Sequence, residues 1–309
     1  TTSDSYDYAM VGQASIIDKK LSLNDSVDKG LEFISKINGD YIIFDGQDST
    51  TLMGTFDVFS KSSAILFLKT VYLNDFDLYK KGWVNGRMYW GEGDYSVPDI
   101  DDYKDKMKLS GTNWGNTLFP NGNFNFHNYN SNKKYDLCGM FQYPQKEKVY
   151  EHKVCQTPHY NKCRKPVYDL INSNKYNACK LIDGKRIPHE EYLQNMFNSK
   201  IIFSPYGYGA YGAPRDVQSA QFGSILIKPR IDWVDTKPNM YVEDETYIAC
   251  EQDFSDLEEK VDYVLSNFEE LQPYLTENFR KRLLDVYNPI HLVKHTYDLF
   301  SELDGVGVA

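Results

Sequence analysis

The sequence predicts an α/β protein made of two successive units, each built from parallel strands and helices. Its 309 residues suit two domains of roughly 150 residues better than one single core. Short apolar runs alternate with segments of helical spacing, which is the pattern of a parallel sheet covered by helices. That pattern is interrupted over residues 85–130 and then begins again. We therefore predict a first domain over residues 1–130, a second over residues 131–285, and a terminal helix over residues 286–309.

The expected elements of the first domain are short. Tyr8–Ile17 holds a first strand, and Ser26–Ile37 has the apolar spacing of a helix. Asp40–Gly46 and Ser63–Leu68 each contain a small apolar run, as a buried strand feeding a loop does. The next residues are rich in Gly, Asn, Asp and Trp, and we interpret them as loops with an irregular edge. The polar stretch Asn121–Lys134 is the expected linker to the second domain.

The second domain repeats the alternation with clearer signals. Pro188 stands at a first-turn position before acidic residues, and Ser255 and Glu258 form a capping-box pattern, so both mark helix starts. The last helix has an apolar stripe at Ile290, Val293, Tyr297 and Phe300, as a helix that packs on a core does. The expected strands are Lys134–Phe141, Lys200–Ser204 and Ser224–Lys228, and the expected helices are Pro166–Asn172, Pro188–Asn198, Arg215–Phe222, Phe254–Phe268, Tyr274–Val286 and Ile290–Leu303.

Charge and hydropathy exclude several classes of partner. The chain has 34 basic and 44 acidic residues and a formal net charge of -10, with no basic stretch that would contact nucleic-acid phosphates. No apolar run reaches the roughly 18 residues of a membrane span. The start, Thr1–Tyr8, is polar and acidic, unlike a signal peptide, and five scattered cysteines suit a reducing compartment. We expect no nucleic-acid partner, no membrane span, and a cytoplasmic location, in the host cytoplasm if the protein is viral.

One segment stands out as a ligand site. Ser199–Asp216 contains an apolar strand, a glycine-rich loop and the start of a helix. Small residues let a diphosphate approach the backbone, and the N-terminus of a helix favours an anion. Arg215 can add a bidentate phosphate contact. The segment therefore predicts a turn that binds a pyrophosphate group.

Two ligand classes compete for this turn. Gly207, Gly209 and Gly212 satisfy the dinucleotide pattern G-x-G-x-x-G, and Asp232 follows at the distance of a ribose-binding acid. An NAD-dependent oxidoreductase is therefore one interpretation. Against it, a strand and a helix precede the pattern within its domain, Pro205 stands at its entrance, and bulky tyrosines separate the glycines.

The same segment resembles the donor-binding segment of exostosin-like, GT-B-type glycosyltransferases. Their pattern is S-K, an apolar strand, S-P-x-G-x-G, an arginine, an acidic residue and a small-residue strand. Here it corresponds to Ser199-Lys200, Ile201–Phe203, Ser204-Pro205-Tyr206-Gly207-Tyr208-Gly209, Arg215 and Gly223–Ile227. The resemblance covers about the last 110 residues. It implies a GT-B-like fold, with two Rossmann-like domains facing across a cleft and a C-terminal helix that returns to the first, in a soluble enzyme of bacterial or viral type.

The resemblance also implies a reaction. A hexosyl or pentosyl group would pass from a nucleoside-diphosphate donor, a UDP-sugar, to a hydroxyl of a glycan or glycoprotein acceptor. The implied transfer is inverting and requires no cofactor, with a divalent metal as the less favoured option. The implied donor-binding residues are Tyr206, Gly207, Tyr208, Gly209, Arg215, Asp216, Gln218 and Arg164. A non-catalytic glycan-binding module is a third interpretation, but such a module has no need of a glycine loop followed by a helix.

One position departs from the family pattern. Three residues after Arg215 the family has Glu, which accepts hydrogen bonds from the donor ribose, and this chain has Gln218. An amide oxygen still accepts, but the charge is lost. Asp216 is a local substitute for that charge.

An inverting transferase needs a base that deprotonates the acceptor hydroxyl. Parallel sheets bind ligands at the carboxyl ends of their strands, where Asp45 and Asp48 follow one predicted strand and Asp75 follows the next. We favour Asp48 as the base, and Asp75 after it. A retaining enzyme would need no such base.

Metal-binding patterns are weak. Asp75-Phe76-Asp77 and Asp99-Ile100-Asp101 match the D-x-D motif of GT-A transferases, but such matches are common in an acidic chain. His152, Cys155, His159 and Cys163 have a spacing that no standard zinc finger uses. We expect no metal ligands.

Overall fold

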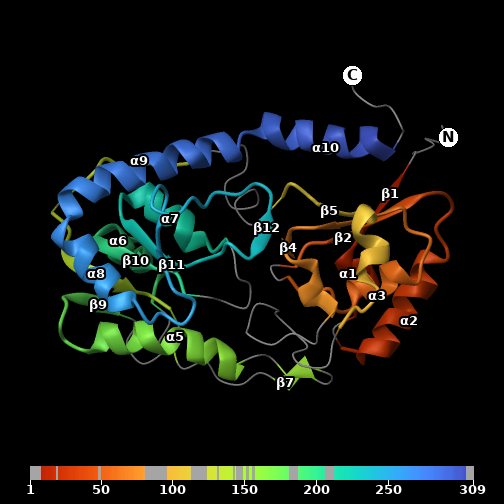
Figure 1. Cartoon of the computed structure of the whole chain (residues 1–309), viewed down its shortest axis with the longest axis horizontal. Coiled ribbons are helices and arrows are strands. Elements are labelled where there is room, and N and C mark those ends of the chain that lie inside the picture. The colour runs from red at the N-terminus through yellow and green to blue at the C-terminus, as the bar shows by residue number, and fades with distance from the viewer. Residues whose placement is uncertain are drawn as a thin grey trace.

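The chain forms two α/β units that lie side by side, with the first on the right of Figure 1 and the second on the left. The computed structural model describes residues 8–18, 20–47, 50–80, 96–112, 124–130, 132–141, 143, 149–150, 153–154, 157–180, 187–205 and 212–303. Each unit has its own parallel sheet, so the α/β class and the Rossmann-like layering that the sequence predicts are confirmed.

The first unit is built on a four-stranded sheet in the order β1-β2-β3-β5, in which every neighbouring pair is parallel. Because strands of this kind are covered on both faces, they consist of nearly continuous apolar residues. Its strands are β1 (Ala9–Gly12), β2 (Tyr41–Asp45), β3 (Leu66–Lys69) and β5 (Met107–Leu109). Its helices are α1 (Gln13–Ile16), α2 (Leu23–Ile34), α3 (Thr55–Ser60) and the 3-10 helices η1 (Phe76–Lys80) and η2 (Ile100–Lys106).

Alternate residues of β2 and β3 point to opposite faces of this sheet. Ile43 and Phe67 belong to the cluster that also contains buried side chains of α1, α2 and α3. Ile42 and Leu68 face the other side, where they pack with Leu299 of the C-terminal helix α10 (Pro289–Leu303). The helix that ends the chain therefore supplies the second covering layer of the first sheet, as predicted.

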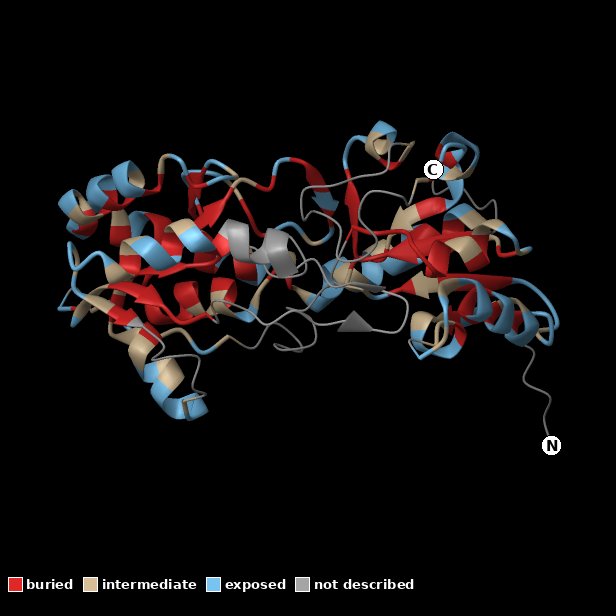
Figure 2. Ribbon diagram, turned by 90° about the horizontal axis from the view of Figure 1, so that it is seen from below, coloured by how far each residue is buried: buried red, intermediate tan, exposed pale blue. Residues whose placement is uncertain are grey.

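The second unit has a five-stranded parallel sheet in the order β13-β11-β10-β6-β9. Helices cover both faces, and Figure 2 shows the buried strands between them. The strands are β6 (Tyr135–Gly139), β9 (Ala178–Lys180), β10 (Ser199–Phe203), β11 (Ile225–Pro229) and β13 (Ile248–Cys250). The helices are α5 (Thr157–Asn172), α6 (His189–Phe197), α7 (Pro214–Phe222), α8 (Leu257–Ser266) and α9 (Phe268–Val286). A two-stranded ribbon, β7 (Val149–Tyr150) with β8 (Lys153–Val154), precedes α5.

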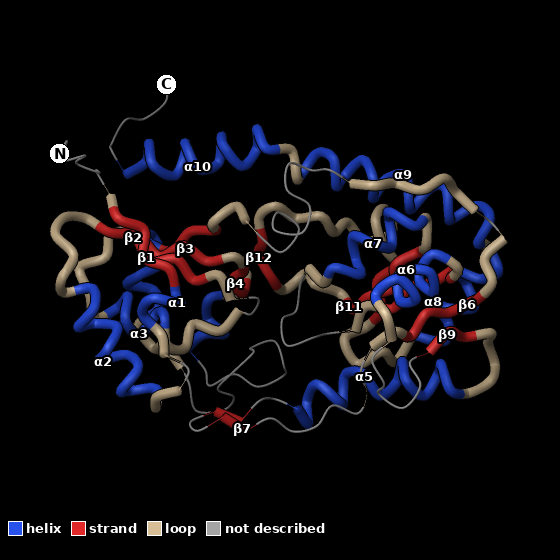
Figure 3. The backbone as a smooth tube through the Cα atoms, turned by 180° about the vertical axis from the view of Figure 1, so that it is seen from behind, coloured by secondary structure: helices blue, strands red, loops and turns tan. Residues whose placement is uncertain are grey.

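A short antiparallel ladder joins the two units. β4 (Val71–Leu73) of the first unit pairs with β12 (Val234–Thr236), which follows the second sheet, and the ladder lies between the units in Figures 1 and 3. The Asn74 backbone N–H donates to the Trp233 carbonyl at 3.1 Å, and the Asn74 side chain donates to the Asp232 carbonyl at 2.5 Å. Among the described strands, β4 and β12 pair only with each other, so the ladder is formed by both units together.

Residues 124–130, within the expected linker, lie against the second unit. The His127 backbone N–H donates to the Gln221 carbonyl at 2.9 Å, and Arg280 of α9 donates to the His127 carbonyl at 2.7 Å. Phe124 packs edge-on against Tyr287, with 5.8 Å between the ring centroids. This segment is thus anchored to α7 and α9.

Several expected details are wrong. The stripe of Ile290, Val293 and Tyr297 on α10 is exposed by 60–70%, because the inward face of this helix is the one that carries His295 and Leu299. The helix expected at 166–172 begins at Thr157 and includes Pro166. The capping box expected at Ser255 is absent, since α8 is preceded by Asp256, which makes no side-chain cap. Across the described residues, no helix is both long enough and apolar enough to cross a membrane.

Candidate functional site

The strand order of the second sheet marks one place for a ligand. The chain runs from β6 outward to β9 and then returns to the other side of β6 with β10, so the order reverses between β6 and β10. In open parallel sheets, ligands bind beyond the carboxyl ends of the strands at such a switch point. The residues that follow β10 and those that begin α7 therefore lie where a ligand is expected to bind. The first sheet keeps its described strands in chain order and has no reversal of this kind.

The start of α7 is shaped for the close approach of a ligand. Pro214 is its first residue, where a missing N–H costs no hydrogen bond. Gly212 has a φ of 65°, which disfavours any residue with a side chain, and an added Cβ would meet nothing within 4 Å. Ser204, at the end of β10, is fully buried, and its Oγ has no hydrogen-bond partner among the described residues.

Arg215 lies in the first turn of α7, where a positive charge opposes the helix dipole. Its side chain is half-buried, and in the described part of the chain its buried Nη1 atom donates to nothing. Burial raises the pKa of the Cys138 thiol to about 12, and the positive charge of Arg215 opposes that shift. Burial likewise raises the pKa of the Tyr192 phenol, again against the charge of Arg215. Arg215 is thus close to the end of β6 and to α6, at the switch point.

Gln218 lies one turn further along α7, on the same side as Arg215. Its Oε1 atom accepts a long hydrogen bond of 3.5 Å from the Tyr192 hydroxyl of α6. The amide is half-buried. Arg215, Gln218 and Tyr192 therefore form one polar group beside the carboxyl end of β10.

Asp216 is placed in the interior, with no exposed surface. Its Oδ2 atom accepts from the Ala213 backbone N–H at 3.3 Å and from the Tyr241 hydroxyl, and it lies 3.1 Å from the Lys228 Nζ. Its Oδ1 atom is buried with no partner among the described residues. Protein groups therefore occupy Oδ2. Asp216 is the expected substitute for the family's ribose-binding glutamate, and only its Oδ1 atom is left to accept from a donor ribose.

Lys228 and Tyr241 were not expected in the site. Lys228 lies in the buried strand β11 and Tyr241 follows β12, and both contact Asp216. The Tyr241 hydroxyl also accepts from the Gly212 backbone N–H at 2.9 Å, so it holds the last glycine before α7. The only signal in the sequence was a lysine inside an apolar strand, which requires a partner when it is buried.

Arg164 of α5 is 4% exposed, and its guanidinium stacks over the Phe141 ring at 5.4 Å. Because Phe141 closely follows β6, Arg164 also lies near the carboxyl end of that strand. The expected loop residues Tyr206, Gly207, Tyr208 and Gly209 fall outside the described residues.

The carboxylates expected to act as a base have different surroundings. Asp48 lies outside the described residues. Asp45 is fully buried and forms an ion pair of 3.1 Å with the fully buried Lys69. Asp75 is exposed, and its Oδ1 accepts from the Asp77 backbone N–H at 3.0 Å at the start of η1. Asp45 is thus committed to the core, whereas Asp75 remains open to solvent beside the ladder that joins the units.

Aspartates of the two D-x-D matches form ion pairs with lysines. Asp77 and Asp101 both pair with Lys80, and Asp101 also pairs with Lys104. Within the ranges that the structure describes, no three potential metal-ligating side chains come together. His152 and Cys155 lie outside those ranges, and His159 and Cys163 are in α5, where only the backbone is described.

Asp232, the expected ribose-binding acid of a dinucleotide site, lies in the turn before β12. It is exposed, and its carbonyl accepts from Asn74 of the first unit. Asp232 is therefore part of the contact between the two units.

Comparison with known proteins gives distant likenesses only. No protein-family model matches the chain. No curated protein matches it either. Among solved structures, the chain is similar to a glycosyltransferase from Rickettsia africae, with 14% identity, a TM-score of 0.43, and 91% of this chain and 81% of that chain covered. It is also similar to sucrose-phosphate synthase from Thermosynechococcus elongatus, with 11% identity, a TM-score of 0.48, and coverages of 98% and 75%. A third similar structure is Anabaena HepE in complex with UDP, with 9% identity, a TM-score of 0.39, and coverages of 95% and 72%.

Proposed function

We propose that the protein is a glycosyltransferase that transfers a hexosyl or pentosyl group from a nucleoside-diphosphate donor, a UDP-sugar, to a hydroxyl of a glycan or glycoprotein. The second unit binds the donor at the switch point between β6 and β10. The first unit carries the acceptor and the base. The reaction inverts the anomeric centre.

The unpaired Nη1 atom of Arg215 is the observation that carries the proposal. A buried cationic donor without a partner costs folding free energy, and a helix N-terminus makes a cation still less favourable. A bound diphosphate removes both penalties, because its oxygens accept from the guanidinium and the N-terminus of α7 favours its charge. The unpaired Oγ of Ser204 supplies a second donor at the same strand end.

The remaining residues have separate roles in this proposal. Tyr206, Gly207, Tyr208 and Gly209 are the proposed contacts of the diphosphate, and Gln218, oriented by Tyr192, accepts from a ribose hydroxyl through its amide oxygen. Arg164 is a second cation for the diphosphate. Asp216 positions the site by holding the first turn of α7 against Lys228 and Tyr241.

Arg215 and the α7 N-terminus stabilise the negative charge that develops on the departing diphosphate as the glycosidic bond breaks. These groups are fixed before the substrate binds, so the transition state requires little reorganisation. Since they supply the positive charge, the proposed transfer needs no divalent metal. Asp48 is the proposed base that removes the acceptor proton, and Asp75 is the alternative.

The central test is the replacement Arg215→Ala. Loss of a charge-assisted phosphate contact of about 1.5–3 kcal/mol should weaken UDP binding by roughly tenfold or more. Isothermal titration calorimetry with UDP, with and without EDTA, measures this change. Lys281→Ala on α9 is the matched control, because it removes one positive charge from a side chain that is 69% exposed and pairs with Glu277 of the same helix.

UDP affinity should be unchanged in Lys281→Ala and unaffected by EDTA. Equal UDP affinity in wild type and Arg215→Ala would contradict the proposed site. Since the glycine spacing of Gly207, Gly209 and Gly212 also suits a dinucleotide, NAD is titrated in parallel. Binding of NAD without binding of UDP would favour the oxidoreductase.

A further inference from the structure

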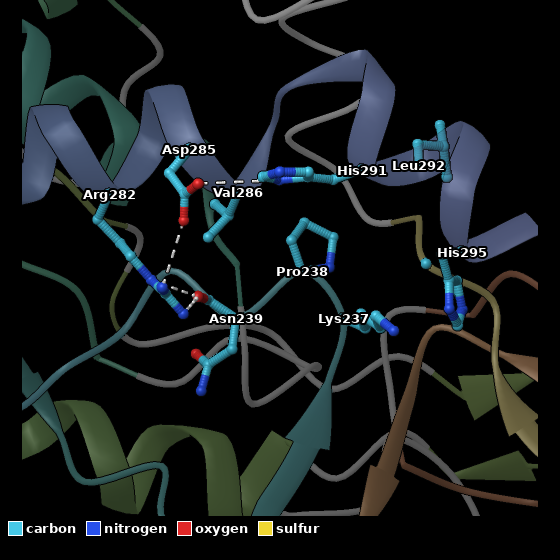
Figure 4. Close-up of a pocket in the computed structure, with 10 residues that line it drawn as sticks. Lys237, Pro238, Asn239, Arg282, Asp285, Val286, His291, Leu292 and His295 are labelled. Atoms are coloured by element: carbon cyan, nitrogen blue, oxygen red, sulfur yellow. Dashed lines mark hydrogen bonds and ion pairs between the residues drawn. The ribbon is translucent and has the colours of Figure 1, made fainter. Parts of the chain in front are cut away.

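A pocket of about 230 Å³ lies at the joint between the two units, away from the switch point. Its lining comes from Gly111 after β5, residues 237–239 after β12, the end of α9 and the first half of α10. Figure 4 shows Pro238 near Val286 and His291, and Lys237 between Pro238 and His295. None of its lining residues belongs to the group around Arg215.

The lining is basic in a chain whose net charge is -10. Lys237, Arg282, His291 and His295 contribute to it, against one acid, Asp285. The Asp285 carboxylate lies 3.7 Å from Arg282 and 3.9 Å from the His291 Nδ1. Lys237 is exposed and makes no ion pair or hydrogen bond with the described residues. Among those residues, the positive charge of Lys237 at the pocket thus has no counter-ion.

The arrangement of these groups favours a phosphate over a carboxylate. One edge of the Arg282 guanidinium is occupied, since its Nε and Nη2 atoms donate to the Asn239 carbonyl at 3.0 and 2.7 Å. Its Nη1–Nη2 edge is left for a ligand and can contact one side of an anion. The cations come from separate segments, and a tetrahedral anion presents oxygens in several directions. Apolar side chains, Val286 and Leu292, lie beside the charged groups and offer a surface for the organic part of an ester.

The pocket is also physically linked to the start of α7. Asn239 lines the pocket, and two residues later Tyr241 bonds to Asp216 and to the Gly212 N–H. On the other side, the His295 Nε2 lies 2.7 Å from the Leu109 carbonyl of the first unit. An added Cβ at Gly111 would lie 2.3 Å from the His295 ring, so this contact requires glycine. A ligand here would touch both units and the segment that holds the first turn of α7.

We propose that this pocket binds a small anion with a phosphate group, either inorganic phosphate or a phosphate monoester, between Lys237, Arg282 and the histidines of α10. Its volume is below the range of about 300–1,000 Å³ that is typical of drug-sized ligands, so a compact metabolite fits. The bound anion joins the α9–α10 turn to residues 237–239.

Calorimetric titration with inorganic phosphate and with a hexose 6-phosphate tests the site, and the variants are Lys237→Gln, Lys294→Gln and Arg215→Ala. Lys237→Gln should weaken phosphate binding about tenfold or more, because a charge-assisted contact is lost. Lys294→Gln is the matched control, since this lysine is exposed on the same helix as His291 and does not line the pocket. Arg215→Ala should keep the wild-type phosphate affinity, which separates this site from the proposed donor site.

Hydrogen exchange on the wild-type protein gives a second measurement that needs no variant. Phosphate should slow amide exchange in 237–241 and at the start of α10. Tighter binding of the hexose phosphate would identify an ester as the ligand class, and equal affinity would identify inorganic phosphate. Unchanged affinity in Lys237→Gln, loss of binding in Arg215→Ala, or acetate binding as tight as phosphate would each overturn the proposal, whatever the outcome of the UDP experiment.

Discussion

Asp216 shows how much of this fold depends on single buried polar side chains. It has no exposed surface, and it ties α7 to β11 through Lys228 and to the segment after β12 through Tyr241. The pair with Lys228 is almost completely buried, so removal of either partner would leave an uncompensated charge in the core. A residue that the sequence suggests as a ligand contact is therefore mainly a structural anchor of the site.

Buried tyrosines give the protein a defined sensitivity to alkaline pH. Burial raises the pKa values of Tyr72, Tyr79 and Tyr241 well above 10. Above pH 10 the unfolded chain loses these protons and the folded protein keeps them. Stability is therefore fully present below pH 10, and it falls as the pH rises further, by about 1.4 kcal/mol per pH unit for each group. Denaturant unfolding between pH 8 and 11.5 should show this loss.

Tyr79→Phe isolates the contribution of one group. Its hydroxyl accepts from the Leu73 N–H at 2.9 Å and donates to the Thr50 carbonyl at 2.9 Å, so the variant should be less stable by about 1–3 kcal/mol at pH 8. Above pH 10 its stability should fall less steeply than that of wild type. Tyr297→Phe, at a ring that is 60% exposed, should match wild type at every pH. If the stability of Tyr79→Phe fell with pH as steeply as that of wild type, Tyr79 would not contribute to the alkaline sensitivity.

At the scale of elements, α10 shows which features a local sequence pattern can predict and which it cannot. The helix itself was predictable from its periodicity, and its return to the first unit was implied by the resemblance to GT-B glycosyltransferases. The face that α10 buries could not be predicted, because it packs against Ile42, Leu66 and Leu68, which precede it by more than 200 residues in the sequence. The apolar stripe at Ile290, Val293 and Tyr297 points away from that sheet.

Two substitutions on this helix should therefore differ in effect. Leu299→Ala removes a side chain that is 8% exposed and packs on the first sheet, and it should lower the free energy of unfolding by about 2–4 kcal/mol. Val293→Ser, at 67% exposure, should change it by no more than about 0.5 kcal/mol. Urea unfolding of both variants measures the difference, and a similar cost for the two would mean that the stripe faces inward.

The same contrast holds for strands and for the candidate site. β10, α7 and β11 were predictable because apolar runs, Pro214 and the glycines around them are local signals. The three-residue strands β4, β5, β9, β12 and β13 were missed, since they are defined by pairing with distant segments. Arg215 and Gln218 could be identified from their spacing in the sequence. Tyr192, Lys228 and Tyr241 could not, because only the fold brings them to α7.

On the scale of the whole molecule, the two units share one core. A single cluster of buried side chains runs from the helices of the first sheet, through Leu73 and Val234 of the joining ladder, to α7 and α9 of the second unit. A proposed transfer between a donor on one unit and an acceptor on the other depends on this continuity, because the reacting groups must meet at a fixed distance.

The joining ladder should therefore decide whether the units unfold together. In the wild type, native-state hydrogen exchange should give the same free energy of opening for the central strands of both sheets, as expected of one cooperative unit.

Asp235, paired with Tyr72, is exposed, and proline at this position cannot donate to the ladder. Asp235→Pro should split the opening free energies of β2 and β10 by at least about 1 kcal/mol, since it removes ladder hydrogen bonds and strains β12. Asp235→Ala keeps the backbone N–H and should behave like wild type. If the strands still open together in Asp235→Pro, the coupling resides instead in α10 and its contact between His295 and Leu109.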